Sequence, residues 1–447
     1  MPGSHRVAPE VRAVLPRGFM RRLALIAAAG LVLRVLCVAF LGPGNEGPLP
    51  GDVAYFHVIA NLLADGAGYV NPRSVAEGIP GIPSAEHPPL WPLLLAGASE
   101  LGFTGPVSHR LVGCPVGAAV IVLVGLLGRR VGGEPVGLVA AGATALFPSF
   151  IAADGSLMSE TLYGGLVGAV LLAALRLRDR PSLPRAAVVG AAIGLAALTR
   201  AEAVALLAIL VLPLVLRLEP GRRLAIGAVA LGTVLVVLAP WAIRNTTTFD
   251  RPVLVSTNDG SAILGANCDL TYGGRQVGFW TPACFQPVSS ANEGIQAARW
   301  RSDGLRYAAD HPVRLLGVVV PVRLLRTLGV WAPLSRENVP EGRVAAVSRA
   351  GQFLYYLLLL PMGIAGVLML RRGGRGQTLL VLSAPLTLML AVTVATYGYS
   401  RFRHVGEIAL VVLASFAAVQ LSRRRGSARA PRRASAPCAP RIKATRG

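Results

Sequence analysis

The residues of this chain that could do chemistry are acidic and basic side chains placed beside apolar segments. Asp52 and Tyr55 lie in the sequence GDVAYFHVIANLLADGAGYV, which begins at Gly51. A carboxylate can take the proton of a hydroxyl group that attacks an electrophile, so Asp52 is a candidate general base. A structural role is the alternative, because Gly51 and Asp52 also predict a helix start, with Asp52 as the N-cap and Gly66 at the helix end.

Further candidates lie at the ends of other apolar segments. They are Glu86 and His87 in EHPPLW, Glu160 in SETLY, Arg200 in LTRAEAV, Arg244 and Asn245 in PWAIRN, and Arg401 and Arg403 in SRFRH. Arginine holds phosphate oxygens through its fork of N–H groups. A lipid headgroup or a local ion pair would explain any one of these arginines. The whole set, placed among acidic residues, indicates an anion-binding cleft.

The composition identifies the elements that must position these side chains. Of the 447 residues, 53% are hydrophobic and 15% are charged, and the mean hydropathy is +0.57. Soluble domains carry about 25% charged residues, and several apolar runs reach the roughly 18 residues that cross a bilayer. We therefore predict an all-α polytopic membrane protein with about ten transmembrane helices. The predicted spans lie near residues 21–41, 109–128, 134–151, 157–175, 186–199, 201–217, 223–243, 351–370, 377–397 and 404–421.

The net charge of +22 follows the predicted topology. If the spans alternate from a cytoplasmic N-terminus, the cytoplasmic segments hold the excess of positive charge and the outer segments are almost neutral, as the positive-inside rule expects. The basic residues then face anionic lipid headgroups, and we expect no nucleic-acid partner. We predict a plasma-membrane protein with both termini in the cytoplasm and the candidate site on the extracytoplasmic side.

The same topology divides the chain into five parts. These are a cytoplasmic N-terminal segment 1–20, a transmembrane module 21–243 that includes the outer loop 42–108, an extracytoplasmic loop 244–350, C-terminal transmembrane helices 351–421, and a disordered basic cytoplasmic tail 422–447. The proline-interrupted segment 88–103 is interpreted as an outer-leaflet half-helix, since a full span there would put Arg129 and Arg130 outside. The segment 311–331, which contains several arginines, is interpreted as a juxtamembrane helix.

Several of these motifs resemble, in their order along the chain, those of the GT-C class of integral-membrane glycosyltransferases. The motifs are GDVAYFHVIANLLADGAGYV, EHPPLWPLLLAG, FPSFIAADGSLMSETLY, LAALTRAEAV, PWAIRN, STNDGSAILGAN and SRFRH. More narrowly, they resemble the protein-mannosyltransferase and aminoarabinose-transferase-like group of glycosyltransferase family 39. The resemblance covers most of the chain apart from the C-terminal tail.

The resemblance implies a GT-C fold and an enzyme that moves a hexosyl or pentosyl group from a polyprenyl-phosphate donor. The acceptor would be a glycan, lipid or protein at the extracytoplasmic face, and the anomeric carbon would be inverted. Asp52 matches the family's base and Glu160 its second acidic position. The residues that match substrate-binding motifs are Tyr55, Glu86, His87, Arg200, Arg244, Asn245, Arg401 and Arg403. His87 departs from the lysine of many relatives. No cofactor is certain, although Asp52 and Glu160 could hold a divalent metal.

Two of the five cysteines, Cys268 and Cys284, lie in the predicted outer loop, whereas Cys37, Cys114 and Cys438 lie in spans or in the tail. An oxidising compartment favours disulfides, so we predict a bond between Cys268 and Cys284, with two free thiols as the alternative. Zinc is disfavoured because no histidine lies nearby in the sequence.

A transporter or flippase of lipid-linked sugars is the competing function. Transporters place ionisable groups near the bilayer midplane and often contain inverted repeats. In this sequence only Arg34 lies clearly inside a span, no repeat of fixed period is visible, and the polar residues collect at the outer ends of spans. These features favour the transferase.

Overall fold

A computed structural model describes residues 16–42, 49–79, 81–285, 292–333, 335 and 339–429 of the chain. These residues form helices joined by turns and loops, and they contain no named β-strand. The predicted all-α class is confirmed. Most of the predicted N-terminal segment and most of the predicted tail, including Cys438, lie outside the described residues.

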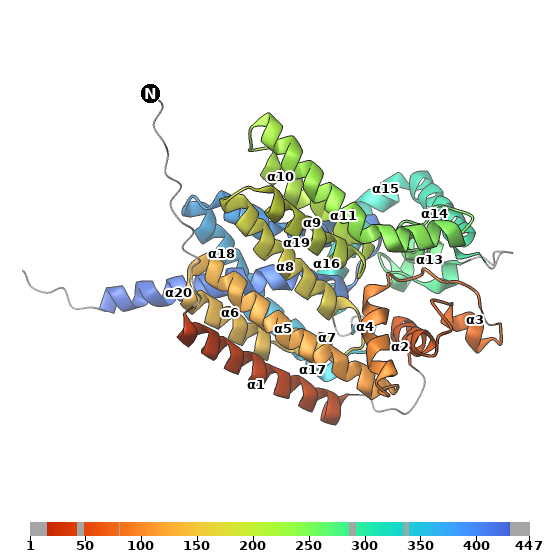
Figure 1. Ribbon diagram of the computed structural model, residues 1–447, viewed down its shortest axis with the longest axis horizontal. Coiled ribbons are helices and arrows are strands. Elements are labelled where there is room, and N and C mark those ends of the chain that lie inside the picture. The colour runs from red at the N-terminus through yellow and green to blue at the C-terminus, as the bar shows by residue number, and fades with distance from the viewer. Residues whose placement is uncertain are drawn as a thin grey trace, which may run out of the picture.

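Within the described part of the chain, seven helices are long and apolar enough to cross a membrane. They are α1 (Arg17–Leu41), α5 (Pro106–Gly132), α8 (Glu160–Asp179), α11 (Pro220–Thr248), the continuous pair α17 (Ala345–Leu354) and α18 (Leu360–Arg372), α19 (Gly376–Ala395), and the helix that contains α20 (Arg403–Arg429). Figure 1 shows that α1, α5 and α8 pack side by side. The chain is therefore a polytopic membrane protein, as predicted.

The other predicted spans correspond to bent or shorter elements. Helices α6 (Glu134–Leu146) and α7 (Pro148–Asp154) meet at 60° and would together make an eighth span. Helix α9 (Leu183–Ala197) and the run of short helical turns Ala201–Val215 are apolar but have only 15 residues each. Such a helix is roughly 22 Å long, which is less than the bilayer core of about 30 Å.

The bend between α6 and α7 explains the arginine inside the first span. Pro148 has no N–H group, so the helical ladder stops there. Arg34 donates hydrogen bonds to the carbonyl oxygens of Thr144 and Ala145, each at 3.1 Å, and its Nε donates to Asp154 at the end of α7. The side chains of Arg34 and Asp154 are 0% and 2% exposed. A buried charge inside a membrane needs such a partner, so Arg34 holds the bent pair against α1.

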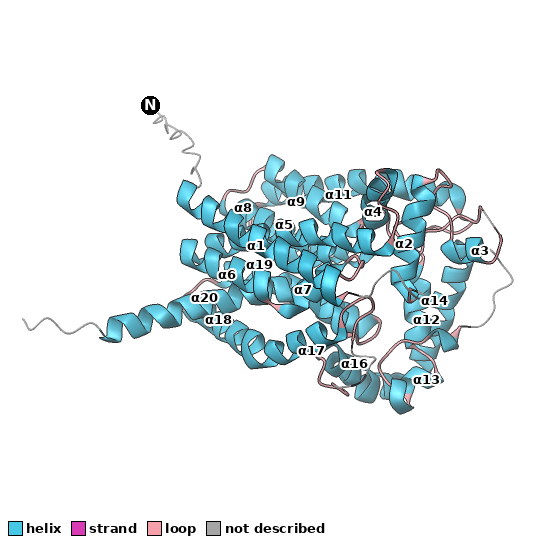
Figure 2. Cartoon of the chain, turned by 90° about the horizontal axis from the view of Figure 1, so that it is seen from below, coloured by secondary structure: helices cyan, strands magenta, loops and turns pink. Residues whose placement is uncertain are grey.

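Short helices gather at one end of the bundle, as Figure 2 shows. They are α2 (Gly51–Ala64), α3 (Pro72–Ala76), α4 (Leu90–Glu100), α12 (Asn258–Ala266), α13 (Asp269–Tyr272), α14 (Glu293–Asp310) and α16 (Val320–Leu328). The 11 residues of α4 span roughly 16 Å, a length that fits the predicted half-helix. The predicted juxtamembrane segment 311–331 contains α15 (Pro312–Arg314) and α16 and is not among the candidate spans.

Two predicted features are wrong. Helix α2 begins at Gly51 after Pro50, so Asp52 lies in its first turn and is not the N-cap. The carboxylate of Asp52 is therefore available to other groups. Helix α20 continues to Arg429, so residues 422–429 are helical and not disordered. Three arginines, which are good helix formers, follow the predicted span at positions 423–425.

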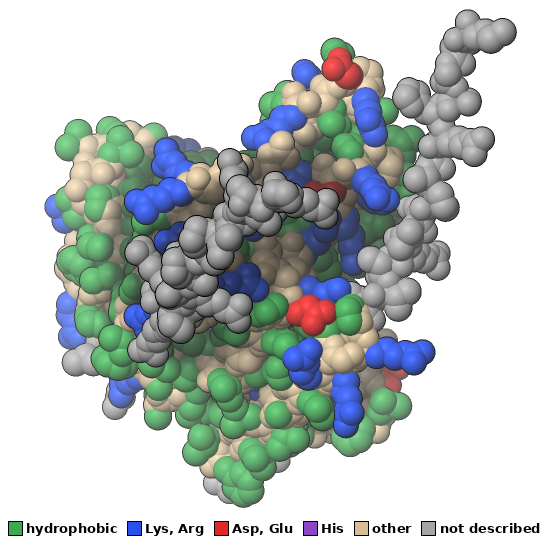
Figure 3. All heavy atoms as spheres, turned by 90° about the vertical axis from the view of Figure 1, so that its left-hand side faces the viewer, with side chains coloured by type: hydrophobic (Ala, Val, Ile, Leu, Met, Phe, Trp, Pro, Cys, Tyr) green, Lys and Arg blue, Asp and Glu red, His purple; other side chains and the backbone are tan. Residues whose placement is uncertain are grey.

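The charged side chains at the opposite end of the bundle are mostly basic. Figure 3 shows this face, where blue Lys and Arg side chains surround a few red acidic ones. Arginines occupy the last turns of α5, α8 and α18 at this end. A basic end is what the positive-inside rule predicts for the cytoplasmic side of a membrane protein.

Candidate active site

A cavity of about 640 Å³ lies where the helix bundle meets the short helices at its end. Its charged lining residues are Asp52, His87, Arg200, Glu202, Asp259, Arg301 and Arg401. Four of these, Asp52, His87, Arg200 and Arg401, were predicted from the sequence. Asp52 and Arg401 are in direct contact, although they lie 349 residues apart in the chain. The fold thus brings predicted residues from the first predicted outer loop, from the junction of two predicted spans and from the start of the last span to one hollow.

Asp52 is held between two basic groups. Arg401 Nη1 donates to Asp52 Oδ2 at 2.9 Å, and His87 Nε2 lies 3.4 Å from Asp52 Oδ1. Burial raises the pKa of Asp52, but the charges of Arg401 and His87 outweigh burial, so the pKa of Asp52 lies well below its ordinary value. The carboxylate is therefore ionised at neutral pH.

Arg401 joins the two carboxylates that were predicted to be catalytic. Besides the contact with Asp52, its Nε lies 3.9 Å from Glu160 Oε1. Glu160 begins α8, and its side chain is only 5% exposed. Arg200 Nη1 lies 3.4 Å from the same Glu160 oxygen, and Arg200 Nε donates to Glu202 Oε1 at 2.6 Å. Acidic and basic groups therefore alternate in a cluster beside the cavity.

A further carboxylate beside Asp52 was not found by sequence analysis. Glu341 Oε2 accepts a hydrogen bond from the backbone N–H of Asp52 at 3.2 Å, at the helix end where an anion is favoured. Gly51 has a φ of 41°, and a Cβ there would lie 2.8 Å from both Glu341 carboxylate oxygens, so glycine is required. Burial and the charge of Asp52 raise the pKa of Glu341. Glu341 lies 289 positions from Asp52 in the chain, so no local sequence motif could connect the two residues.

Four of the predicted residues lie behind the cavity lining. They are Tyr55, Glu86, Arg244 and Asn245. The Tyr55 hydroxyl lies 3.0 Å from Ser84 Oγ, and its ring contacts the His87 ring with centroids 4.8 Å apart. Arg244 donates to the carbonyl of Ser84 at 2.7 Å and to Asn245 Oδ1 at 3.0 Å. The carbonyl of Glu86 accepts a hydrogen bond from the Ser256 hydroxyl. This layer supports the segment that carries His87.

Arg403 does not join the cluster around Asp52. Its Nε donates to Glu407 at 2.9 Å, and its guanidinium lies 4.1 Å above the Tyr355 ring. Residues two positions apart in a helical turn do not face the same side. The two arginines of SRFRH therefore separate, and only Arg401 lines the cavity.

The opposite wall of the cavity comes from the second outer loop. Asn258 and Asp259 begin α12, and Arg301 on α14 donates from Nε to Asp259 Oδ2 at 2.6 Å. Glu293 fixes this wall to the first loop, because its Oε2 accepts hydrogen bonds from the backbone of Ala85 at 2.8 Å and from the hydroxyl of Thr257 at 3.1 Å. The wall therefore has a fixed position relative to His87, two residues beyond Ala85.

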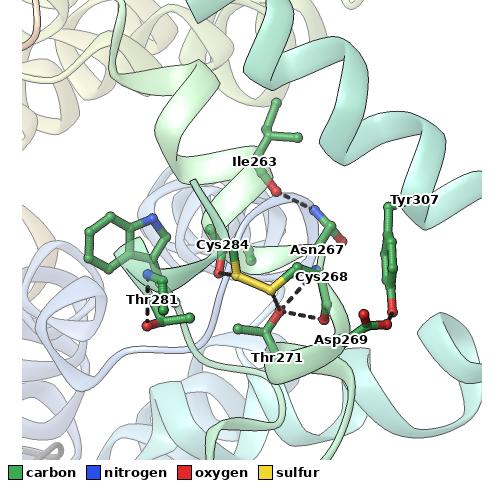
Figure 4. The surroundings of a disulfide bond; sticks show 12 residues. Ile263, Asn267, Cys268, Asp269, Thr271, Thr281, Cys284 and Tyr307 are labelled. Atoms are coloured by element: carbon green, nitrogen blue, oxygen red, sulfur yellow. Dashed lines mark hydrogen bonds between the residues drawn. A yellow bond between two sulfur atoms is a disulfide. The ribbon is translucent and has the colours of Figure 1, made fainter. Parts of the chain in front are cut away.

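The predicted disulfide between Cys268 and Cys284 is present, as Figure 4 shows. Its neighbours are held by local hydrogen bonds, including one of 2.7 Å from Asn267 Nδ2 to the carbonyl of Ile263. A disulfide that closes a loop of this length stabilises a fold by roughly 3 kcal/mol in the chain-entropy account. Cys37 and Cys114 are buried and unbonded.

In the described part of the chain, no group of three His, Cys, Asp or Glu side chains is arranged to hold a metal ion. The cation between Asp52 and Glu160 is the Arg401 guanidinium.

Comparison with known proteins supports the fold and the predicted resemblance. Residues 86–243 match a family described as dolichyl-phosphate-mannose-protein mannosyltransferase. None of the curated proteins compared matches the chain.

A solved structure shares the fold of this chain. The archaeal oligosaccharyltransferase AglB from Archaeoglobus fulgidus, in complex with an inhibitory peptide and a dolichol-phosphate, is similar over 93% of this chain, with 15% identity and a TM-score of 0.55. The match covers 52% of the archaeal chain, so this chain spans about half its length. At that identity the likeness establishes the fold alone.

Two more structures match with a TM-score of 0.42, which is too low for a structural argument. One is the S. cerevisiae protein O-mannosyltransferase Pmt1–Pmt2 complex bound to the sugar donor, with 15% identity over 58% of this chain and 38% of that chain. The other is ArnT from Cupriavidus metallidurans bound to undecaprenyl phosphate, with 18% identity over 91% of this chain and 79% of that chain. The fold and the family match together support the predicted resemblance to GT-C glycosyltransferases of the mannosyltransferase type.

Proposed function

We propose that this protein is a membrane glycosyltransferase that moves a hexosyl or pentosyl group from a polyprenyl phosphate to an acceptor hydroxyl, with inversion at the anomeric carbon. The observation that carries the proposal is the pair of Asp52 and Arg401 on the cavity wall, because it places a carboxylate base beside a group suited to phosphate. The family match and the dolichol-phosphate bound by the archaeal enzyme support a lipid phosphate as the donor group.

In the proposed step, the acceptor oxygen attacks the anomeric carbon as the bond from that carbon to the phosphate oxygen breaks. Asp52 takes the proton of the acceptor hydroxyl. Arg401 stabilises the negative charge that develops on the departing phosphate. Glu160 Oε1 lies 3.9 Å from Arg401 Nε and helps to hold the guanidinium in place. The products are an inverted glycoside and a polyprenyl phosphate.

Donor binding activates the base in this scheme. While Arg401 is bonded to Asp52, the low pKa of Asp52 makes it a weak base. A donor phosphate competes for the same guanidinium and weakens its hold on Asp52. The pKa of Asp52 then rises toward the operating pH, where general-base catalysis is most efficient. Proton transfer is thereby favoured only when the donor is in place.

The two walls of the cavity suit the two substrates. Val392 and Ala395 line the cavity and belong to α19, a candidate membrane span, so the polyprenyl chain reaches the site beside them. The wall of Asn258, Asp259 and Arg301 lies outside every candidate span, so we assign it to the acceptor, which is a glycan, lipid or protein. We place the cavity on the extracytoplasmic side and both termini in the cytoplasm, because the basic face in Figure 3 is at the opposite end.

His87 makes donor binding depend on pH. Burial and the charge of Arg401 lower the pKa of His87, whereas the charge and contact of Asp52 and the charge of Glu86 raise it. The net result is a pKa above the ordinary value of histidine. His87 is therefore cationic at low pH and loses its charge as pH rises through this raised pKa. We expect the affinity for polyprenyl phosphate to fall over the same interval. His87→Lys, which stays charged, should flatten the profile, whereas an unchanged profile in this variant would remove His87 from the donor site.

The test of the function uses purified protein in nanodiscs with a panel of polyprenyl-phosphate sugars, starting with the mannosyl donor. We expect release of polyprenyl phosphate together with formation of a glycosylated acceptor. A transporter would instead move the intact lipid-linked sugar across a sealed vesicle without breaking the glycosyl bond. Translocation of the donor with no cleavage of any panel member would favour the transporter.

A further inference from the structure

The guanidinium of Arg401 is held from behind by the turn that leads to it. Residues 396–399 connect α19 to the helical turn Ser400–Phe402. Arg401 Nη2 donates to the Tyr397 hydroxyl at 3.2 Å, and the guanidinium lies 5.3 Å from the centre of the Tyr399 ring. The position of these two tyrosines therefore sets the direction in which Arg401 reaches Asp52.

The loop closed by the disulfide packs directly against this turn. The backbone N–H of Gly398 donates to the carbonyl of Gly278 at 2.9 Å. The Phe279 ring meets the Tyr399 ring edge-on at 5.3 Å and the Tyr397 ring at 6.4 Å. Residues 278 and 279 thus contact three consecutive residues of the turn.

The turn has no room to shift on its other side. A Cβ at Gly398 would lie 2.2 Å from the carbonyl oxygen of Arg323 in α16, and the backbone of Tyr399 donates to Thr327 Oγ1 at 3.2 Å. Gly278 has a φ of 71°, and a Cβ there would lie 2.9 Å from the backbone nitrogen of Arg323. The turn is therefore confined between α16 and the loop.

The loop itself is fixed by the disulfide and by an arginine. The bond between Cys268 and Cys284 closes the segment that contains Gly278 and Phe279. Arg326 Nε donates to the carbonyl of Val277 at 2.7 Å, and its guanidinium lies 5.2 Å from the centre of the Phe279 ring. The disulfide limits how far the ends of the loop can separate, and the loop limits how far the turn can move.

We propose that the disulfide-closed loop positions Arg401 for the donor phosphate, with Phe279 packing against the two tyrosines that hold the guanidinium. Phe279 and the disulfide act through Arg401 and do not touch the substrates. The inference rests on the donor-binding role proposed above for Arg401.

The test compares Phe279→Ala with Phe103→Ala, using undecaprenyl phosphate as the probe in nanodiscs. Phe103 is the control, because it is an exposed phenylalanine that follows α4 and belongs to neither the loop nor the turn. We expect Phe279→Ala to weaken probe binding by roughly 3- to 30-fold, the range typical of residues that act through a neighbour. Transfer at saturating donor should slow as well, because Arg401 also stabilises the departing phosphate. Phe103→Ala should match the wild type in both measurements.

A double-mutant cycle separates positioning from general destabilisation. If Phe279 acts through Arg401, then Phe279→Ala should cause no further loss of probe binding in the Arg401→Ala background. Independent, additive losses would overturn the proposal. Phe279→Leu keeps an apolar side chain and should bind the probe more tightly than Phe279→Ala, which keeps the test valid if the alanine variant is unstable.

The disulfide allows a second, independent test of the positioning role. Replacing both cysteines by alanine should weaken probe binding in the same direction. Reduction of the wild type, with both thiols verified by mass spectrometry, should reproduce that loss and leave the double variant unchanged. Wild-type affinity in the reduced protein and in Phe279→Ala would overturn the positioning role. Failure of the wild type itself to bind the probe would instead contradict the proposed function.

Discussion

Asp52→Asn is expected to slow sugar transfer by about 10²–10⁴-fold, because general-base catalysis contributes about that much. Asparagine has nearly the same size and keeps an oxygen that accepts the hydrogen bond from Arg401, so the substitution removes mainly the charge and the basicity. Loss of a helix cap does not contribute to the effect of this substitution, since Asp52 is not the N-cap of α2. The measurement is the initial rate of transfer at saturating donor and acceptor.

The same variant should bind polyprenyl phosphate at least as tightly as the wild type. The reason is that Asp52 competes with the phosphate for Arg401, and asparagine competes less. Asp65→Asn is the matched control, because Asp65 caps the other end of α2 and is exposed. It should leave transfer and binding unchanged. A rate in Asp52→Asn above about a tenth of the wild type would show that another group is the base.

Arg401→Ala is expected to weaken polyprenyl-phosphate binding by about 10- to 100-fold, because hydrogen bonds to charged groups contribute about 1.5–3 kcal/mol. Transfer at saturating donor should slow as well, since the guanidinium also stabilises the departing phosphate. Titration of the variant with undecaprenyl phosphate, alongside the rate measurement, distinguishes this pattern from that of Asp52→Asn, which slows transfer without weakening binding.

Arg401→Lys should restore only part of the binding. Arg401 reaches Asp52, Glu160 and Tyr397 through three different nitrogens, and lysine has a single one. Arg73→Ala, which removes an exposed arginine from the last turn of α3, controls for the loss of a positive charge. Wild-type binding of the probe by Arg401→Ala would place the donor phosphate elsewhere in the cavity.

Local composition was enough to predict the long spans and the charge asymmetry between the two ends of the bundle. Hydropathy is a property of about 20 consecutive residues, so it can be read without knowing the fold. The disulfide was accessible for a similar reason, since only Cys268 and Cys284 fall outside the predicted spans and the tail. Short motifs likewise indicated Asp52, His87, Arg200 and Arg401, which the structure brings to one cavity.

The sequence was less informative where a helix is bent or where two roles compete. Arg34 looked like an isolated charge in a span, but it satisfies the carbonyls left open at the bend before Pro148 and pairs with Asp154. Asp52 looked equally suited to capping, and the helix start at Gly51 decides against it. Both outcomes depend on backbone geometry that a few residues of sequence do not specify.

The sequence by itself determined the membrane class, the charge asymmetry and most of the residue types at the candidate site. Only the tertiary structure decided which charges meet. It pairs Asp52 with Arg401, sends Arg403 to Glu407, brings Glu341 to the start of α2, and places Arg301 beside Asp259. Ion pairs and hydrogen bonds act over a few ångströms, and these partners lie up to 349 positions apart in the chain. Helix packing, and not sequence spacing, sets those distances.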